Sequence, residues 1–118
     1  PGSLAQVAAR LTARVDALIR RERPDRLIVH GDTLTALAAA QAGWLNGIKV
    51  AHVEAGLRTY RHDAPWPEET IRQLLDRQCD LLLAPTPAAV SNLAAERVAG
   101  RIVLTGNSGI DALRIGLG

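Results

Sequence analysis

The sequence has few aromatic residues and lacks both phenylalanine and methionine. Two tryptophans and one tyrosine are its only aromatic side chains, although 47% of its 118 residues are hydrophobic. A core without large rings must be built from Leu, Val, Ile and Ala, so we expect helices and sheet to pack at short distances. No apolar run approaches the length of a membrane span and no signal peptide is recognisable, so we expect a cytoplasmic protein with no membrane partner.

Cysteine is equally scarce. Cys79 is the single cysteine, so it cannot form an internal disulfide, which is typical of a reducing compartment. It lies just before the apolar run 81–84, a position that favours a buried, inert thiol over a nucleophile. The absence of methionine and the start at Pro1 are compatible with a fragment of a longer protein.

Charge is low as well, with a formal net charge of +2. A nucleic-acid-binding surface needs basic side chains gathered on one element. The only such cluster is Arg20, Arg21, Arg23 and Arg26, at a predicted helix end where cations complement the helix dipole. We therefore expect no nucleic-acid partner.

Helical and strand-like segments alternate along the whole chain. Apolar residues recur every three or four positions between Leu4 and Glu22, which predicts an amphipathic helix with Ser3 as its N-cap. The remaining predicted helices span residues 33–45, 67–78, 87–98 and 109–117, and the predicted strands span residues 26–30, 48–53, 80–84 and 101–105.

The predicted strands are apolar on successive residues, as in Arg26–His30. This pattern is typical of strands covered on both faces, and hence of a parallel sheet. Regular alternation with right-handed crossovers predicts an α/β fold: a three-layer open parallel sheet of about four strands with helices on both faces. One edge of the first strand should be bare unless something outside this chain covers it.

Polar residues follow the carboxyl end of each predicted strand, where ligands bind in open parallel sheets. These ends are His30-Gly31-Asp32, His52–Gly56, Pro85-Thr86 and Thr105–Ser108. Gly31, Gly56 and Gly106 would let a ligand approach the backbone. Neither a Walker sequence nor a Gly-x-Gly-x-x-Gly fingerprint is present.

Each acidic candidate has a structural alternative. Asp32 is either the N-cap of the next helix or a site residue. Glu54 closes a buried strand, where a carboxylate costs desolvation; it either pairs with Arg58 or does acid–base work. Glu68 and Glu69 are explained by the helix dipole when taken alone.

The histidines also leave alternatives open. His30 and His52 are either core residues or, together with Asp32 and Glu54, ligands of a divalent metal. His62 is expected to be exposed. Trp66, between two prolines, is expected to anchor its loop.

Four motifs together carry a family resemblance. They are His30-Gly31-Asp32-Thr33, His52–Thr59, Pro65–Glu69 followed by Arg72, and Thr105-Gly106-Asn107 with Ile110–Leu113. In this order and spacing they resemble the non-hydrolysing UDP-N-acetylglucosamine 2-epimerase family across nearly the whole chain. One departure is Ile71, where the family usually has Asn.

The resemblance implies a fold of two Rossmann-like domains of the GT-B type, with the active site in the cleft between them. Residues 1–118 would be a single partial Rossmann-like domain, the C-terminal half of the family's N-terminal domain, with the second domain absent. The family is dimeric, so the resemblance also implies a homodimer in the full-length protein.

The implied reaction interconverts UDP-GlcNAc and UDP-ManNAc through elimination and re-addition of UDP. It needs an acid and a base on either side of the sugar, and neither a metal nor a redox cofactor. Asp32, Glu54 and Glu68 match the family's catalytic carboxylates. The substrate-binding or orienting residues implied are His30, His52, Arg58 and Arg72.

Three other functions remain open on the sequence. A hydrolysing epimerase would release UDP and N-acetylmannosamine. A truncated module would have no activity, because half a cleft cannot preorganise a transition state. A metal-dependent phosphohydrolase would use the metal ligands named above.

Overall fold

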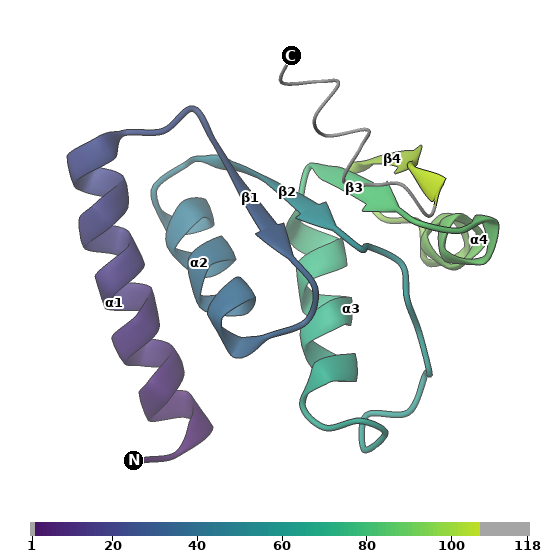
Figure 1. The fold of residues 1–118 in the computed structure, drawn as a ribbon, viewed down its shortest axis with the longest axis horizontal. Coiled ribbons are helices and arrows are strands. Elements are labelled where there is room, and N and C mark those ends of the chain that lie inside the picture. Colours follow the sequence, from purple (N-terminus) through teal and green to yellow (C-terminus); the bar gives the residue numbers. More distant parts are fainter. Residues whose placement is uncertain (1, 107–118) are drawn as a thin grey trace.

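A computed structural model describes residues 2–106 of the chain (Figure 1). The helices are α1 (Leu4–Glu22), α2 (Leu34–Leu45), α3 (Glu68–Gln78) and α4 (Pro87–Glu96), and the strands are β1 (Arg26–His30), β2 (Lys49–Val53), β3 (Leu81–Ala84) and β4 (Arg101–Leu104). Each agrees with its predicted span to within two residues at either end. The predicted helix over 109–117 and the motif residues from Asn107 onward lie outside the described part.

Side chains close the helix starts. Ser3 caps α1 in a reciprocal capping box with Gln6, as predicted. Thr33 caps α2, its hydroxyl accepting the Ala36 N–H at 3.1 Å. The alternative of Asp32 as the N-cap is therefore wrong, and its carboxylate is available for another partner.

The four strands form one parallel sheet in the order β1-β2-β3-β4, which confirms the predicted parallel α/β sheet flanked by helices. Within residues 2–106, however, α2, α3 and α4 all cover the same face, because sequential strand order with crossovers of one hand places the connecting helices on one side, so the predicted helices on both faces are not seen in this part of the chain. Val29 lies beside His52, and His52 beside Leu82, so the carboxyl ends of β1, β2 and β3 meet at one rim. Within the described residues β1 is an edge strand, and Ile28 is 55% exposed. The predicted bare edge is present in this part of the chain.

The buried core lies between one sheet face and three helices. Its strand residues Val29, Val50 and Leu82 share that face, and α2, α3 and α4 cover it. Gly43 of α2 lies so close that a Cβ there would be 2.8 Å from the Leu27 side chain. The expected tight spacing is thus realised. Helix α1 packs along α2, as Figure 1 shows.

None of the described helices is long and apolar enough to cross a membrane. Cys79 is buried and free, as predicted. Burial, with the charges of Asp76 and Asp80, raises the pKa of its thiol to about 12, so the thiol stays neutral and unreactive.

Candidate active site

Two adjacent strands turn in the same way at the rim. Gly31 follows β1 with φ 79°, and Glu54 follows β2 with φ 69°. The strands stay paired to this point, with the Gly31 N–H donating to the Val53 carbonyl at 3.1 Å. A left-handed conformation costs a non-glycine residue about 1–2 kcal/mol, and such strain concentrates at functional sites. Glu54 is therefore held in place at a local cost in stability.

The Glu54 side chain turns toward the neighbouring strand end. Its Oε1 lies 2.9 Å from Nε2 of His30, and both side chains remain about half exposed. The alternative pairing of Glu54 with Arg58 is wrong. A partly exposed carboxylate beside an imidazole can exchange protons with a ligand at the rim.

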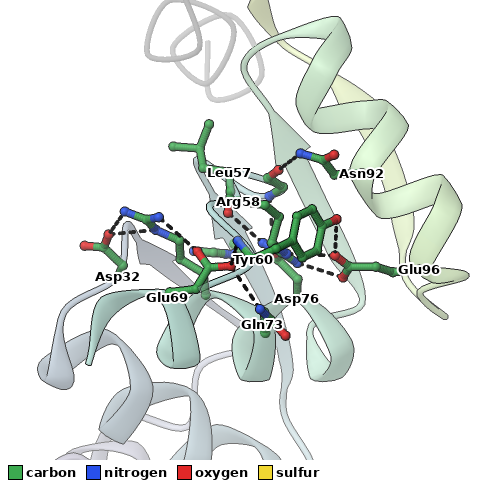
Figure 2. A network of polar contacts seen from close by, with 12 residues as sticks. Asp32, Leu57, Arg58, Tyr60, Glu69, Gln73, Asp76, Asn92 and Glu96 are labelled. Atoms are coloured by element: carbon green, nitrogen blue, oxygen red, sulfur yellow. Dashed lines mark hydrogen bonds and ion pairs between the residues drawn. The ribbon is translucent and has the colours of Figure 1, made fainter. Parts of the chain in front are cut away.

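Asp32 lies at the same rim and is held by a cation from α3. Arg72 donates to Asp32 Oδ2 from Nε at 2.9 Å and from Nη2 at 2.8 Å. Its Nη1 also donates to Glu69 at 3.2 Å. The two carboxylates that this guanidinium contacts, Asp32 and Glu69, are labelled in Figure 2. Arg72 thus sets the direction of the Asp32 carboxylate and balances its charge.

The adjacent Glu68 and Glu69 have different surroundings. Glu69 is fully buried and accepts the backbone N–H groups of Thr59 and Tyr60 and an amide N–H of Gln73. Burial acts to raise the pKa of Glu69, but these hydrogen bonds outweigh it and lower that pKa. Glu68 opens α3, is only partly buried, and makes no side-chain hydrogen bond or ion pair with another described residue.

Arg58 points into the interior. Its side chain is fully buried and donates to Asp76 at 2.9 Å and, in two hydrogen bonds of 2.8 and 2.9 Å, to Glu96 (Figure 2). Burial acts to lower the pKa of Arg58, but the hydrogen bond to Glu96 and the charge of Asp76 raise it overall. Arg58 therefore ties the β2–α3 loop to α3 and α4 and is not exposed to a ligand.

His52 is also fully buried, with Nδ1 2.5 Å from Asp76 Oδ1 and Nε2 2.6 Å from the Gly31 carbonyl. Because both ring nitrogens are engaged, the four-residue metal set considered from the sequence is not assembled. No group of three or more His, Cys, Asp or Glu within residues 2–106 could hold a metal.

Two loop residues complete the comparison with the sequence. His62 is exposed, as expected, and contacts the Thr70 hydroxyl. Trp66 is 60% exposed, so the expectation that its ring anchors the loop is wrong. The buried carboxylate of Glu69 and the guanidinium of Arg58 hold the loop instead.

Sequence reasoning missed Tyr60, Asp76 and Glu96. Tyr60 donates its hydroxyl to Glu96 at 2.7 Å, which adds to the Arg58 cluster. One signal for Asp76 was available, since it follows Glu69 by seven residues on the same helix and so shares its face. The sequence contains no comparable local signal for Glu96, whose partner is 38 residues away.

The fold and the rim define a Rossmann-like α/β domain that presents acidic side chains beyond the carboxyl ends of parallel strands. A family model described as UDP-N-acetylglucosamine 2-epimerase matches residues 2–117. The chain belongs to this family.

Relatives agree with that assignment. The UDP-N-acetylglucosamine 2-epimerase of Salmonella borreze is 42% identical over 98% of this chain, and that of Bacillus subtilis is 44% identical over 94%. A structure of the Neisseria meningitidis UDP-GlcNAc 2-epimerase bound to UDP-GlcNAc superimposes with a TM-score of 0.87, at 38% identity over 98% of the chain. The chain spans only 31%, 30% and 32% of these three proteins.

Proposed function

We propose that the whole protein carrying this chain interconverts UDP-GlcNAc and UDP-ManNAc by eliminating and re-adding UDP. The observation that carries the proposal is the meeting of Asp32 and Glu54 at the ends of two adjacent parallel strands, in a chain of this family. The Neisseria meningitidis relative was solved with UDP-GlcNAc bound, which supports a UDP-sugar as substrate.

The proposed roles follow from what each side chain touches. Glu54, beside His30, and Asp32, held by Arg72, exchange protons with the sugar. Glu68 is the third catalytic carboxylate. His30 remains partly exposed and contacts the substrate or orients Glu54.

The other predicted site residues act from a distance. Arg58 and His52 are buried, so they orient the β2–α3 loop and the Gly31–Asp32 segment and do not bind substrate themselves. Arg72 orients Asp32. The reaction requires no metal or redox cofactor, because acid–base chemistry suffices for elimination and addition.

We further propose that residues 1–118 are the C-terminal half of the first of two Rossmann-like domains. The support is that the chain spans about a third of its relatives. Half a cleft cannot position both the sugar and the departing diphosphate. The 118-residue chain alone should therefore show no epimerase turnover, and measurable turnover would contradict this assignment.

The test of function is substitution in the whole protein. Asp32→Asn, Glu54→Gln and Glu68→Gln each keep the size of the side chain and remove its proton-transfer capacity. Each should lower kcat by about 10²–10⁴-fold. Glu22→Gln, on the exposed end of α1, is the matched control and should keep the wild-type rate. If all three site variants retain that rate, the site is wrongly assigned.

Product analysis separates the alternatives. Release of free N-acetylmannosamine with UDP would identify a hydrolysing epimerase instead. Absence of any turnover in the whole protein would favour a non-catalytic module.

We also propose a homodimer, a cytoplasmic location and a role in supplying sugars for cell-surface polysaccharide. Leu45 of α2 is 82% exposed and lines a groove together with alanines of α1, including Ala5, Ala9 and Ala13, and a contiguous exposed apolar surface suits a subunit contact. Sedimentation of the whole protein tests the dimer.

The free, buried thiol of Cys79 is compatible with a reducing compartment, and cell fractionation tests the location.

A further inference from the structure

The buried ring of His52 contacts hydrogen-bond acceptors at both nitrogens. Nδ1 lies 2.5 Å from a carboxylate oxygen of Asp76, and Nε2 lies 2.6 Å from the backbone carbonyl of Gly31. A backbone carbonyl can only accept a hydrogen bond. Nε2 must therefore carry a proton.

The Asp76 carboxylate is itself surrounded by donors. Its Oδ2 accepts the Gly56 N–H and an N–H of Arg58, both at 2.9 Å. Both donors stabilise the ionised form, so Oδ1 presents an anionic acceptor to Nδ1. A neutral imidazole carries only one N–H, and it cannot satisfy two acceptors at these distances.

The charges around the ring are balanced when it is cationic. Asp76 faces it from α3, and Arg58 and Glu96 lie in the same ion-pair chain beyond Asp76. Along the sheet its neighbours are Val29 and Leu82, which are apolar. With His52 protonated, these four charged groups sum to zero, in a region where three of the four side chains are fully buried.

This cluster links the two segments that carry the rim carboxylates. Nε2 of His52 holds the carbonyl directly before Asp32, and Asp76 holds the N–H of Gly56, two residues after Glu54. The contacts are made to backbone atoms, so they fix the position of the chain and leave the carboxylates free. A small displacement of a catalytic group lowers the rate strongly.

We propose that His52 is a positioning residue that donates a hydrogen bond from both ring nitrogens, and that with its partner Asp76 it sets the spacing of Asp32 and Glu54. The kinetic part of this assignment rests on the proposed function. The protonation state does not, and it is measured separately.

The first experiment is two-bond ¹H–¹⁵N NMR of the histidine rings in the 118-residue chain at neutral pH. We expect both nitrogens of His52 to resonate together, as in an imidazolium. The variant His30→Gln/His62→Gln removes the two exposed rings and leaves His52 as the only histidine. Widely separated nitrogen shifts, as in a neutral ring, would overturn the proposal.

Asp76→Asn identifies the partner. The introduced amide keeps its oxygen for Gly56 and Arg58 and turns its NH₂ toward Nδ1, so His52 should become neutral with its proton on Nε2. A spectrum still showing imidazolium would remove Asp76 from the assignment. If this variant does not fold, the double variant above still decides the protonation state.

The second experiment measures kinetics in the whole protein. The amide of His52→Gln cannot donate in both directions, so kcat should fall about 10–100-fold with KM within threefold. Asp76→Asn keeps the hydrogen bond from His52 to the Gly31 carbonyl, so its kcat should fall less than that of His52→Gln. His62→Gln is the control and should match the wild type. An unchanged kcat in His52→Gln would refute the positioning role, whereas an inactive wild-type protein would refute only the proposed reaction.

Discussion

Removing Arg58 should destabilise this domain far more than removing any exposed arginine. Its guanidinium has no exposure and is the shared partner of Asp76, which is also fully buried, and of Glu96, which is 16% exposed. Arg58→Ala leaves Glu96 without a cation and Asp76 with the His52 ring as its only remaining cationic partner, in a region with little exposure. Loss of one partner from a buried ion pair costs about 3–5 kcal/mol.

That cost is large compared with the total free energy of unfolding of a small domain. Domains of this size are stable by about 5–15 kcal/mol, so the variant should lose about a fifth or more of its stability or fail to fold. Arg58→Lys keeps the charge but cannot form the paired hydrogen bonds to Glu96, so we expect an intermediate loss. Arg61 has a side chain that is 70% exposed and lies 3.7 Å from Asp63. Arg61→Ala should therefore change stability by less than about 0.5 kcal/mol.

The assay is urea unfolding of the 118-residue chain, followed by circular dichroism and fitted for all variants together. A double-mutant cycle of Arg58→Lys with Glu96→Gln measures the part of the pairwise term that the guanidinium's paired hydrogen bonds supply, which should be about 0.5–3 kcal/mol. The reasoning fails if Arg58→Ala costs no more than Arg61→Ala. It also fails if the cycle gives no coupling.

Three further predictions use other parts of the same network. The pKa values of Glu69 and Glu96 are lowered by hydrogen bonds that outweigh burial, so their contribution to stability is present above about pH 4.5 and is lost as the pH falls through the lower folded-state values. Acid titration of Glu69→Gln should show a smaller loss of stability over that range than the wild type. Gly56→Ala should destabilise the domain strongly, because its φ is 88° and the new Cβ would lie 2.5 Å from a backbone carbonyl oxygen of α4. Gly47→Ala is the control: its φ is 72° but the new Cβ would have no atom within 4 Å, so the variant should lose only the conformational term of about 1 kcal/mol. Cys79, with a pKa of about 12 and 1% exposure, should react with a thiol reagent only at the rate of unfolding, and fast labelling of the native chain would contradict that.

The network explains why a loop so rich in charge is ordered. Between β2 and α3 most of the chain forms neither strand nor helix, although Ala55 at its start still donates its N–H to the Leu83 carbonyl of β3 at 3.0 Å. Glu69 accepts the N–H groups of Thr59 and Tyr60, and Arg58 donates to the carbonyl of Leu57 at 2.8 Å. Buried side chains thus supply the backbone hydrogen bonds that regular structure would otherwise provide.

Much of the fold followed from the sequence alone. Hydrophobic periodicity predicted four helices and four strands within residues 2–106, and their alternation predicted the parallel sheet. Because the carboxyl ends of neighbouring parallel strands meet, the same pattern also predicted that Asp32 and Glu54 share a rim. These properties depend on neighbours in sequence and on general rules of topology, so the order of residues along the chain is enough to predict them.

Partner choice was decided only by the tertiary structure. A pair of Arg58 with Glu54 was one of two alternatives left open by the sequence, yet Arg58 pairs with Asp76 and Glu96. Asp32 pairs with Arg72, 40 residues away. Two adjacent glutamates, Glu68 and Glu69, end in different environments because successive residues of a helix point in different directions. Which carboxylate is buried, and which cation it pairs with, depends on how α3 and α4 pack against the β2–α3 loop. Local sequence does not encode this packing, because the partners lie far apart along the chain.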